Sequence, residues 1–216
     1  MFGILAKGGP VMIPLLACSL AAVAVAVERG LFFHWLSRSH RELLRAMEEP
    51  LSRRNLGSVG EQCQRYPSPL GSVLSAFLQT PNSLAPSAGV AERAERWGEA
   101  AAYYSPVSAV YADATRPLER FLPVLDTIVT MAPLLGLLGT VTGMIRSFGI
   151  ISLSGIGHPT AITGGVAEAL IATAFGLAIA IFSLFFYNLY QAKAESARAE
   201  VEAQTCRVLA RLGGRD

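Results

Sequence analysis

The sequence predicts an all-α integral membrane protein with three transmembrane helices, a helical cytoplasmic region and a long third helix that extends into the cytoplasm. Hydrophobic residues make up 52% of the 216 residues and charged residues only 16%, which is more apolar than an ordinary soluble domain. Charges are also nearly absent from three stretches of about twenty residues, the length at which a helix crosses the hydrocarbon of a bilayer. Composition and spacing therefore predict the same fold class.

The first span is expected over residues 10–30, because the chain carries no charge over residues 8–27. The letters LLAC ending at Cys18 also resemble a lipoprotein cleavage box, so a cleaved signal peptide is the alternative. The apolar run continues beyond Cys18, and Pro10 and Pro14 interrupt the part that would form the signal core. We therefore expect a retained helix with Pro10 in its first turn, where a missing N–H is harmless.

Residues 31–120 have a soluble-like composition and are expected to form a helical region rather than an independent enzyme domain. His34 and His40 lie on a basic stretch, and we expect them to be interfacial or solvated rather than metal ligands. Apolar residues recur at helical spacing, and prolines and glycines separate the segments. Helices are expected over residues 37–48, 59–66, 70–79 and 88–104, with breaks near Pro106, Pro117 and Pro123.

The second span, expected over residues 121–147, has a face of small residues. Nineteen uncharged residues separate Asp126 from Arg146, which is expected to anchor the outer end of the span. Three glycines fall three and four residues apart and share one side of a helix, and in lipid such a side lets another helix pack closely. The glycines expected to serve helix packing in the second and third spans are Gly136, Gly139, Gly143 and Gly176.

A loop is expected over residues 148–162, followed by the third span over residues 163–190 and a C-terminal segment over residues 191–216. Apart from Glu168, the third span is uncharged. The Ala-rich sequence that follows it favours a helix. One continuous helix is therefore expected from about residue 163 to 212.

The distribution of basic residues predicts the orientation. Of the eighteen Lys and Arg residues, eleven lie between Arg29 and Arg120 and five between Lys193 and Arg215. Basic residues accumulate on the cytoplasmic side of membrane spans. The middle region and the C-terminus are therefore expected in the cytoplasm and residues 1–9 in the periplasm. The formal net charge of +2 gives no indication of a nucleic-acid partner.

Two long motifs, APLLGLLGTVTGMI in the second span and GGVAEALIATAFGLAIAI in the third, resemble the signature helices of the MotA/TolQ/ExbB proton channel family. The resemblance is close over residues 118–188 and looser at KGGPVMIPLLACS near the N-terminus. It implies a stator subunit of the bacterial inner membrane, not an enzyme and without a cofactor, that uses the proton motive force. It also implies a homopentamer around an ExbD/TolR-like single-span partner, with a TonB/TolA-like protein as a further partner. The flagellar MotA branch fits less well, because its members have four spans.

The resemblance implies that Glu168, Thr140 and Thr173 line a proton path. By itself, Glu168 is a costly membrane carboxylate that either faces a wet interior or sits solvated at the interface. A membrane threonine most often bonds the carbonyl oxygen four residues before it. Glu168 and Thr173 lie about 140° apart around a helix, so one of them should face the second span or a neighbouring subunit. Asp126 either accepts protons at the cytoplasmic exit or anchors the helix end.

Several classes of function are disfavoured by what the sequence lacks. It has no phosphate-binding loop, no HExxH motif and no Cys/His cluster, and its three cysteines have no metal-ligand spacing. The alternatives to a proton-conducting stator are a non-conducting membrane scaffold and an intramembrane enzyme, for which a nucleophile–base pair is missing. TonB-type uptake, envelope maintenance and gliding or flagellar motility all remain open as the process that is powered.

Overall fold

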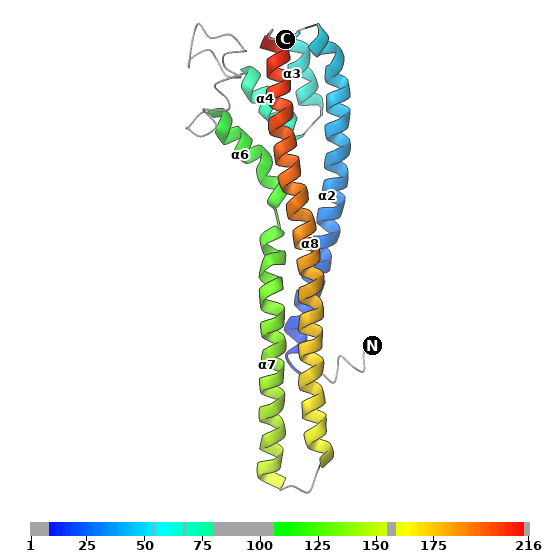
Figure 1. Cartoon of the computed structure of the whole chain (residues 1–216), viewed down its shortest axis with the longest axis vertical. Coiled ribbons are helices and arrows are strands. Elements are labelled where there is room, and N and C mark those ends of the chain that lie inside the picture. The colour runs from blue at the N-terminus through cyan, green and yellow to red at the C-terminus, as the bar shows by residue number, and fades with distance from the viewer. Residues whose placement is uncertain (1–8, 54, 67, 80–105, 155–158, 214–216) are drawn as a thin grey trace. The chain divides into compact units, whose positions relative to one another are not determined.

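The computed structural model describes residues 9–53, 55–66, 68–79, 106–154 and 159–213. Every regular element within these residues is an α-helix. Three of them are long and apolar enough to cross a membrane, namely α2 (Met12–Ser52), α7 (Leu122–Ser154) and α8 (Pro159–Gly213) (Figure 1). The shorter helices are α3 (Leu56–Arg65), α4 (Pro69–Gln79) and α6 (Pro106–Glu119). The prediction of an all-α protein with three long apolar helices is confirmed.

Helix α2 combines the first expected span and the helix expected over residues 37–48. It continues through Gly30, because a single glycine costs a helix only about 1 kcal/mol and no proline follows before Pro50. The prediction that Pro10 lies in the first turn is wrong by two residues. Pro10 lies just before Met12, the first helical residue, and Pro14 takes the place in the first turn.

Helices α7 and α8 extend into the expected loop over residues 148–162 from both sides. Helix α7 continues to Ser154. Helix α8 begins at Pro159, whose fixed φ and missing N–H suit the first position of a helix. It then contains the whole of the helix expected over residues 163–212. The helix expected over residues 88–104 lies outside the described residues.

The break expected between the middle region and the second span is present. Helix α6 ends at Glu119 with Pro117 in its last turn, and α7 begins at Leu122 with Pro123 in its first turn. Between them Phe121 has a φ of 67°, in the left-handed region that a side chain seldom adopts. A proline on each side of one such residue ends one helix and allows the next to start.

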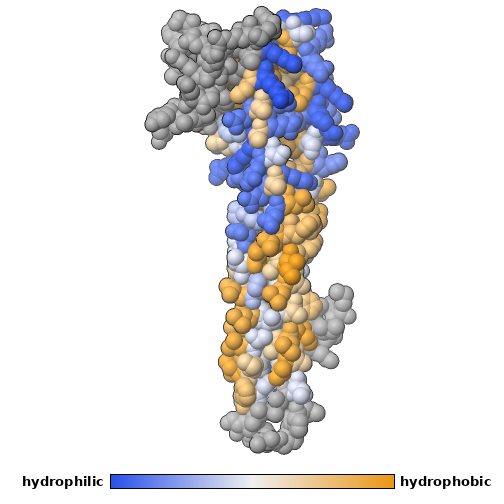
Figure 2. Space-filling model, in the orientation of Figure 1, coloured by the Kyte–Doolittle hydropathy of each residue, from blue (hydrophilic) through white to orange (hydrophobic). Residues whose placement is uncertain are grey.

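The chain forms two compact units, each made of segments that are far apart in the sequence. Unit 1 comprises Met1–Gly30 and Phe121–Gln191, and unit 2 comprises Leu31–Arg120 and Ala192–Asp216. Helices α2 and α8 each contribute one part to each unit. In unit 1, Figure 2 shows hydrophobic side chains over the surface of α7 and of the N-terminal part of α8, as expected of helices that face lipid or other membrane helices.

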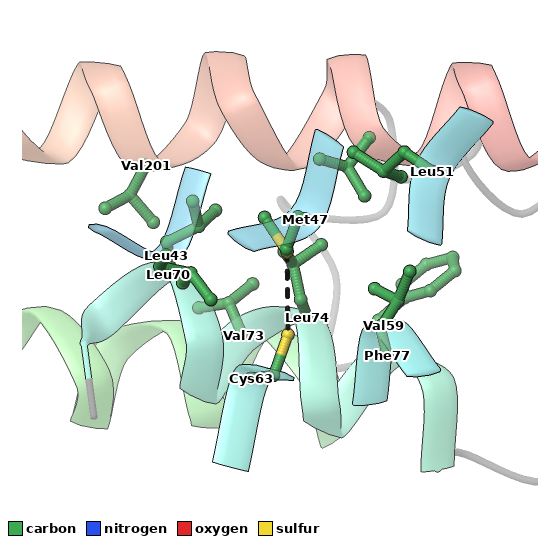
Figure 3. Packing of buried hydrophobic residues seen from close by; sticks show 11 residues of the cluster. Leu43, Met47, Leu51, Val59, Cys63, Leu70, Val73, Leu74, Phe77 and Val201 are labelled. Atoms are coloured by element: carbon green, nitrogen blue, oxygen red, sulfur yellow. Dashed lines mark hydrogen bonds between the residues drawn. The ribbon is translucent and has the colours of Figure 1, made fainter. Parts of the chain in front are cut away.

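Unit 2 has a hydrophobic core of its own, formed by side chains from α2, α3, α4 and α8 (Figure 3). The thiol of Cys63 lies 4.0 Å from the sulfur of Met47, and burial raises the pKa of Cys63 to about 11. Tyr111 of α6 donates a hydrogen bond of 3.3 Å to the carbonyl oxygen of Arg198 in α8. The core consists of Leu43, Met47, Leu51, Val59, Cys63, Leu70, Val73, Leu74, Phe77, Val201 and Val208.

His40 is buried inside unit 2 rather than interfacial or solvated, which corrects the expectation for this residue. Its ring is buried, and its Nε2 lies 3.3 Å from a carboxylate oxygen of Glu200 in α8. His34, by contrast, is exposed. The sequence places His40 on a basic stretch, and only the packing of α8 against α2 inside unit 2 brings a carboxylate to it.

Candidate functional site

The four predicted packing glycines lie where α7 and α8 run antiparallel in unit 1 (Figure 1). A Cβ at Gly139 would lie 2.5 Å from the Cβ of Ala172, and one at Gly143 would lie 3.0 Å from the Cβ of Ala169. A Cβ at Gly136 would lie 3.0 Å from the Cα of Thr173, and one at Gly176 would lie 2.5 Å from the carbonyl oxygen of Ala132, both on the opposite helix. We call this contact the seam. Only residues without a larger side chain allow the two backbones to approach so closely.

The two threonines of the predicted proton path differ in their hydrogen bonds. Thr173 donates across the seam to the carbonyl oxygen of Gly136 at 2.9 Å. Thr140 donates to the carbonyl oxygen of Leu137 in its own helix at 2.7 Å, which is the ordinary behaviour of a helical threonine. In the described residues the two side chains therefore lie beside the same seam, but they do not bond each other.

Glu168 forms an ion pair with Arg146, a residue that the sequence predicts only as an anchor at the outer end of the second span. The guanidinium donates to both carboxylate oxygens, at 2.8 Å and 3.2 Å. The Glu168 side chain is 20% exposed and that of Arg146 is 52% exposed. Sequence reasoning missed this pair, because the pair depends on the register between α7 and α8, which no local pattern specifies.

Asp126 lies apart from these contacts. Its carboxylate is exposed near the start of α7, and no hydrogen bond or ion pair reaches it from the part of the chain that the structure describes. The neighbouring hydroxyls of Thr127 and Thr130 donate to carbonyl oxygens of α7 itself. The structure therefore does not join Asp126 to Glu168 or to Thr173.

Helix geometry divides the site residues between the two sides of the seam. On α7, Thr140 and Arg146 are six residues apart, about 120° around the helix, with the seam residue Gly143 midway between them. On α8, Thr173 and Glu168 are about 140° apart, with the seam residues between them. Asp126 lies within about 40° of Thr140. We call one side the threonine flank (Asp126, Thr140 and Thr173) and the other the ion-pair flank (Arg146 and Glu168).

The start of α2 lies against the ion-pair flank. A Cβ at Gly9 would lie 1.9 Å from Oε1 of Glu168, and a side-chain carbon of Val11 lies near Gly139. Further along α2, the hydroxyl of Tyr190 in α8 donates to the carbonyl oxygen of Ala26 at 2.6 Å. These contacts attach the start of α2 to the ion-pair flank and attach a later turn of α2 to α8.

The described residues contain no group of three or more His, Cys, Asp and Glu side chains that would hold a metal ion. What they combine is one ion pair, two threonines and an exposed carboxylate on long apolar helices. Such groups can carry or guide protons through protein placed in a membrane. This chemistry needs further surfaces to enclose a path, since three helices of one chain do not surround a pore.

Comparison with known proteins gives a consistent result. Residues 76–203 match the MotA/TolQ/ExbB proton channel family. The chain is 30% identical over 204 residues to the biopolymer transport protein ExbB-like 3 of Synechocystis sp., covering 92% of this chain and 88% of that relative. It is 31% identical over 189 residues to the Tol-Pal system protein TolQ of Pseudomonas aeruginosa, covering 86% and 78%. The biopolymer transport protein ExbB of Aquifex aeolicus is 39% identical over 92 residues, which cover 43% of this chain and 62% of that relative.

Proposed function

Because the chain belongs to the MotA/TolQ/ExbB proton channel family, we propose that it is the proton-conducting stator subunit of an inner-membrane energy-transducing complex. Several copies, a homopentamer by resemblance to the family, surround an ExbD/TolR-like single-span protein. Proton flow through this assembly produces force that a TonB- or TolA-like protein receives. The transmembrane potential supplies about 2.3 kcal/mol per proton charge per 100 mV.

The observation that carries this proposal is the threonine flank. Thr140, Thr173 and Asp126 place polar groups along one side of two apolar membrane helices, and α2 covers the other side. In a ring of copies, this flank faces the central partner, and its hydroxyls guide the proton that the partner carries. Asp126 receives the proton at the cytoplasmic end.

Glu168 has a different place in the proposal. It lies on the ion-pair flank, so it meets the path of a neighbouring copy or acts at the outer end of its own. Its role is therefore separable from that of the threonines by mutation.

The orientation belongs to the same proposal. The N-terminus lies in the periplasm, and unit 2, which holds most Lys and Arg residues, lies in the cytoplasm. Cys206 of α8 is exposed in unit 2 and provides the test. A membrane-impermeant maleimide should label it in inverted membrane vesicles and not in intact spheroplasts, and the reverse pattern would exclude this orientation.

The first test of the function is the composition and conduction of the complex. The chain is co-expressed with single-span membrane proteins from its own source, extracted in detergent, weighed by native mass spectrometry and reconstituted in vesicles. We expect a ring of five chains with bound partner and proton uptake driven by a potential. A monomer or dimer without a partner would rule out the stator.

A non-conducting scaffold is the second candidate, because Thr173 and Glu168 both use their polar groups in contacts between α7 and α8. The variants Thr173→Ala and Glu168→Gln decide between the two. Loss of proton uptake by complexes that keep their native mass supports the stator. Unchanged force-dependent function in both variants supports the scaffold.

A further inference from the structure

The Glu168 carboxylate lies where three segments of unit 1 meet. The Glu168 side chain belongs to α8, its Arg146 partner to α7, and the Gly9 backbone to the segment that leads into α2. One guanidinium nitrogen of Arg146 donates to both carboxylate oxygens of Glu168, at 2.8 Å and 3.2 Å. An ion pair between two residues of one helix would not connect separate segments, whereas this pair connects α7 with α8.

Gly9 is suited to this contact in two independent respects. Its φ of +70° lies in the left-handed region that glycine adopts without strain. Its missing side chain leaves the space that Oε1 of Glu168 occupies, since a Cβ would come within 1.9 Å of that atom. The backbone conformation therefore favours glycine, and a Cβ at this position would push the Glu168 carboxylate out of the place that it occupies.

We propose that Arg146 is a positioning residue, which holds the Glu168 carboxylate against Gly9 and so joins α7, α8 and the start of α2 on the ion-pair flank. The role of Glu168 in the complex then depends on the position in which Arg146 holds its carboxylate. The part of the inference that concerns conduction rests on the proposed function. The part that concerns the joining of the helices does not.

The free-energy cost of unpaired charges in a membrane helix supports this role of Arg146. A single arginine or carboxylate within apolar surroundings is costly, and pairing with the opposite charge offsets that cost. Removal of one partner leaves the other charge unpaired, which is more damaging than removal of both. Arg146 and Glu168 should consequently depend on each other in a way that two independent surface charges do not.

A double-mutant cycle tests this dependence in the full-length chain. Arg146→Met keeps most of the alkyl stem and removes the charge, Glu168→Gln keeps the shape and removes the charge, and the third variant combines them. Each single variant should lower the unfolding temperature in detergent by about 3–6 °C, and the double variant should lower it by no more than either single one. Arg38→Met is the matched control, because the 3.6 Å ion pair of Arg38 with Glu42 lies on the exposed face of one helix. This variant should shift the unfolding temperature by less than about 1 °C.

Rescue separates a positioning role from simple packing. Arg146→Lys should keep most of the unfolding temperature, and the exchanged pair Arg146→Glu with Glu168→Arg should recover part of what either single reversal loses. Strictly additive losses in the double variant, or equal shifts in Arg146→Met and Arg38→Met, would overturn the proposal.

Proton uptake by vesicles that hold the chain with its partner gives the second readout. Arg146→Met should reduce uptake by the same factor as Glu168→Gln, and Arg146→Lys should largely preserve it. Uptake that is normal in Arg146→Met but lost in Glu168→Gln would contradict the positioning role. If the unsubstituted complex itself takes up no protons, the proposed function fails, while the unfolding cycle still decides whether Arg146 positions Glu168.

Discussion

The hydroxyl of Thr173 donates to the carbonyl oxygen of Gly136 at 2.9 Å, across the seam between α7 and α8. In an α-helix, the same carbonyl oxygen also accepts a hydrogen bond from the backbone N–H of Thr140, four residues later. The two threonines of the proposed path are thus linked through one acceptor, although their side chains do not bond each other. A change at Thr173 should therefore affect both the contact between the helices and the flank on which Thr140 lies.

Thr173→Val should weaken the contact between α7 and α8, because it keeps the shape and removes the hydroxyl that bonds Gly136. Hydrogen bonds between membrane helices contribute about 0.6 kcal/mol on average, so we expect a loss of that order in the free energy of unfolding. Thr173→Ser retains a hydroxyl and is the control. Equal stability of the Val and Ser variants in a steric-trapping or denaturant titration would show that the bond contributes nothing.

Gly139→Ala should destabilise unit 1, because the new methyl group would meet the Cβ of Ala172 at 2.5 Å. Overpacking of this kind costs about 1–3 kcal/mol when the neighbours cannot move apart freely. Gly149→Ala in the same helix is the control, because nothing lies within 4 Å of a Cβ there. It should leave stability unchanged or raise it slightly, since alanine favours a helix. The unfolding temperatures of the two variants in detergent give the comparison.

Leu74→Ala should destabilise unit 2, because Leu74 is fully buried in the core shared by α2, α3, α4 and α8. Truncation of a buried leucine costs about 2–5 kcal/mol. Arg45→Ala, on the exposed side of α2, should change stability by less than about 0.5 kcal/mol. Digestion of the two variants with a protease that cleaves after glutamate, whose sites neither substitution changes, should show faster cleavage of unit 2 in Leu74→Ala only. Equal cleavage rates would argue against this core.

Cys63 should resist alkylation far longer than Cys206. Burial raises the pKa of the Cys63 thiol from 9.0 to about 11, and the thiolate is the reactive form. Cys206 lies exposed on α8. Iodoacetamide at pH 8 should therefore modify the Cys206 peptide first, as followed by mass spectrometry. Fast labelling of Cys63 in the folded chain would contradict its buried position.

The same shift makes the stability of unit 2 depend on pH. Because the folded state raises the pKa of Cys63, the neutral thiol favours folding, and this contribution is complete below about pH 9. It is lost as the pH rises from about 9 to about 11, where the unfolded chain releases the proton first. Cys63→Ala should remove that part of the alkaline loss. An identical pH dependence in both proteins would show that the thiol is not buried as described.

The three long helices could be predicted because charge-free stretches of sufficient length are visible in the sequence. The seam could be anticipated in part. Three glycines at helical spacing predict one close contact, but the sequence does not say that α8 of the same chain supplies its other side. The Thr173–Gly136 bond could not be found, because it depends on the rotation of α8 about its own axis.

The pairs that sequence reasoning missed are all between residues far apart in the chain. The sequence predicts Arg146 and Glu168 as separate features and His40 as interfacial or solvated, whereas Arg146 pairs with Glu168 and the buried His40 lies beside Glu200. Local patterns report which side of a helix is apolar, but not which helix covers it. Both contacts follow from the way α8 packs, which no local pattern specifies.

The discontinuous make-up of the two units has a consequence for synthesis of the protein. A ribosome completes the α2, α3 and α4 parts of the unit 2 core before it makes any of α7, but Val201 and Val208 of the same core belong to α8. The apolar face of these early helices therefore stays open while the second and third long helices are made and inserted. Until α8 is synthesised, the nascent chain exposes hydrophobic surface to which chaperones bind and through which chains aggregate.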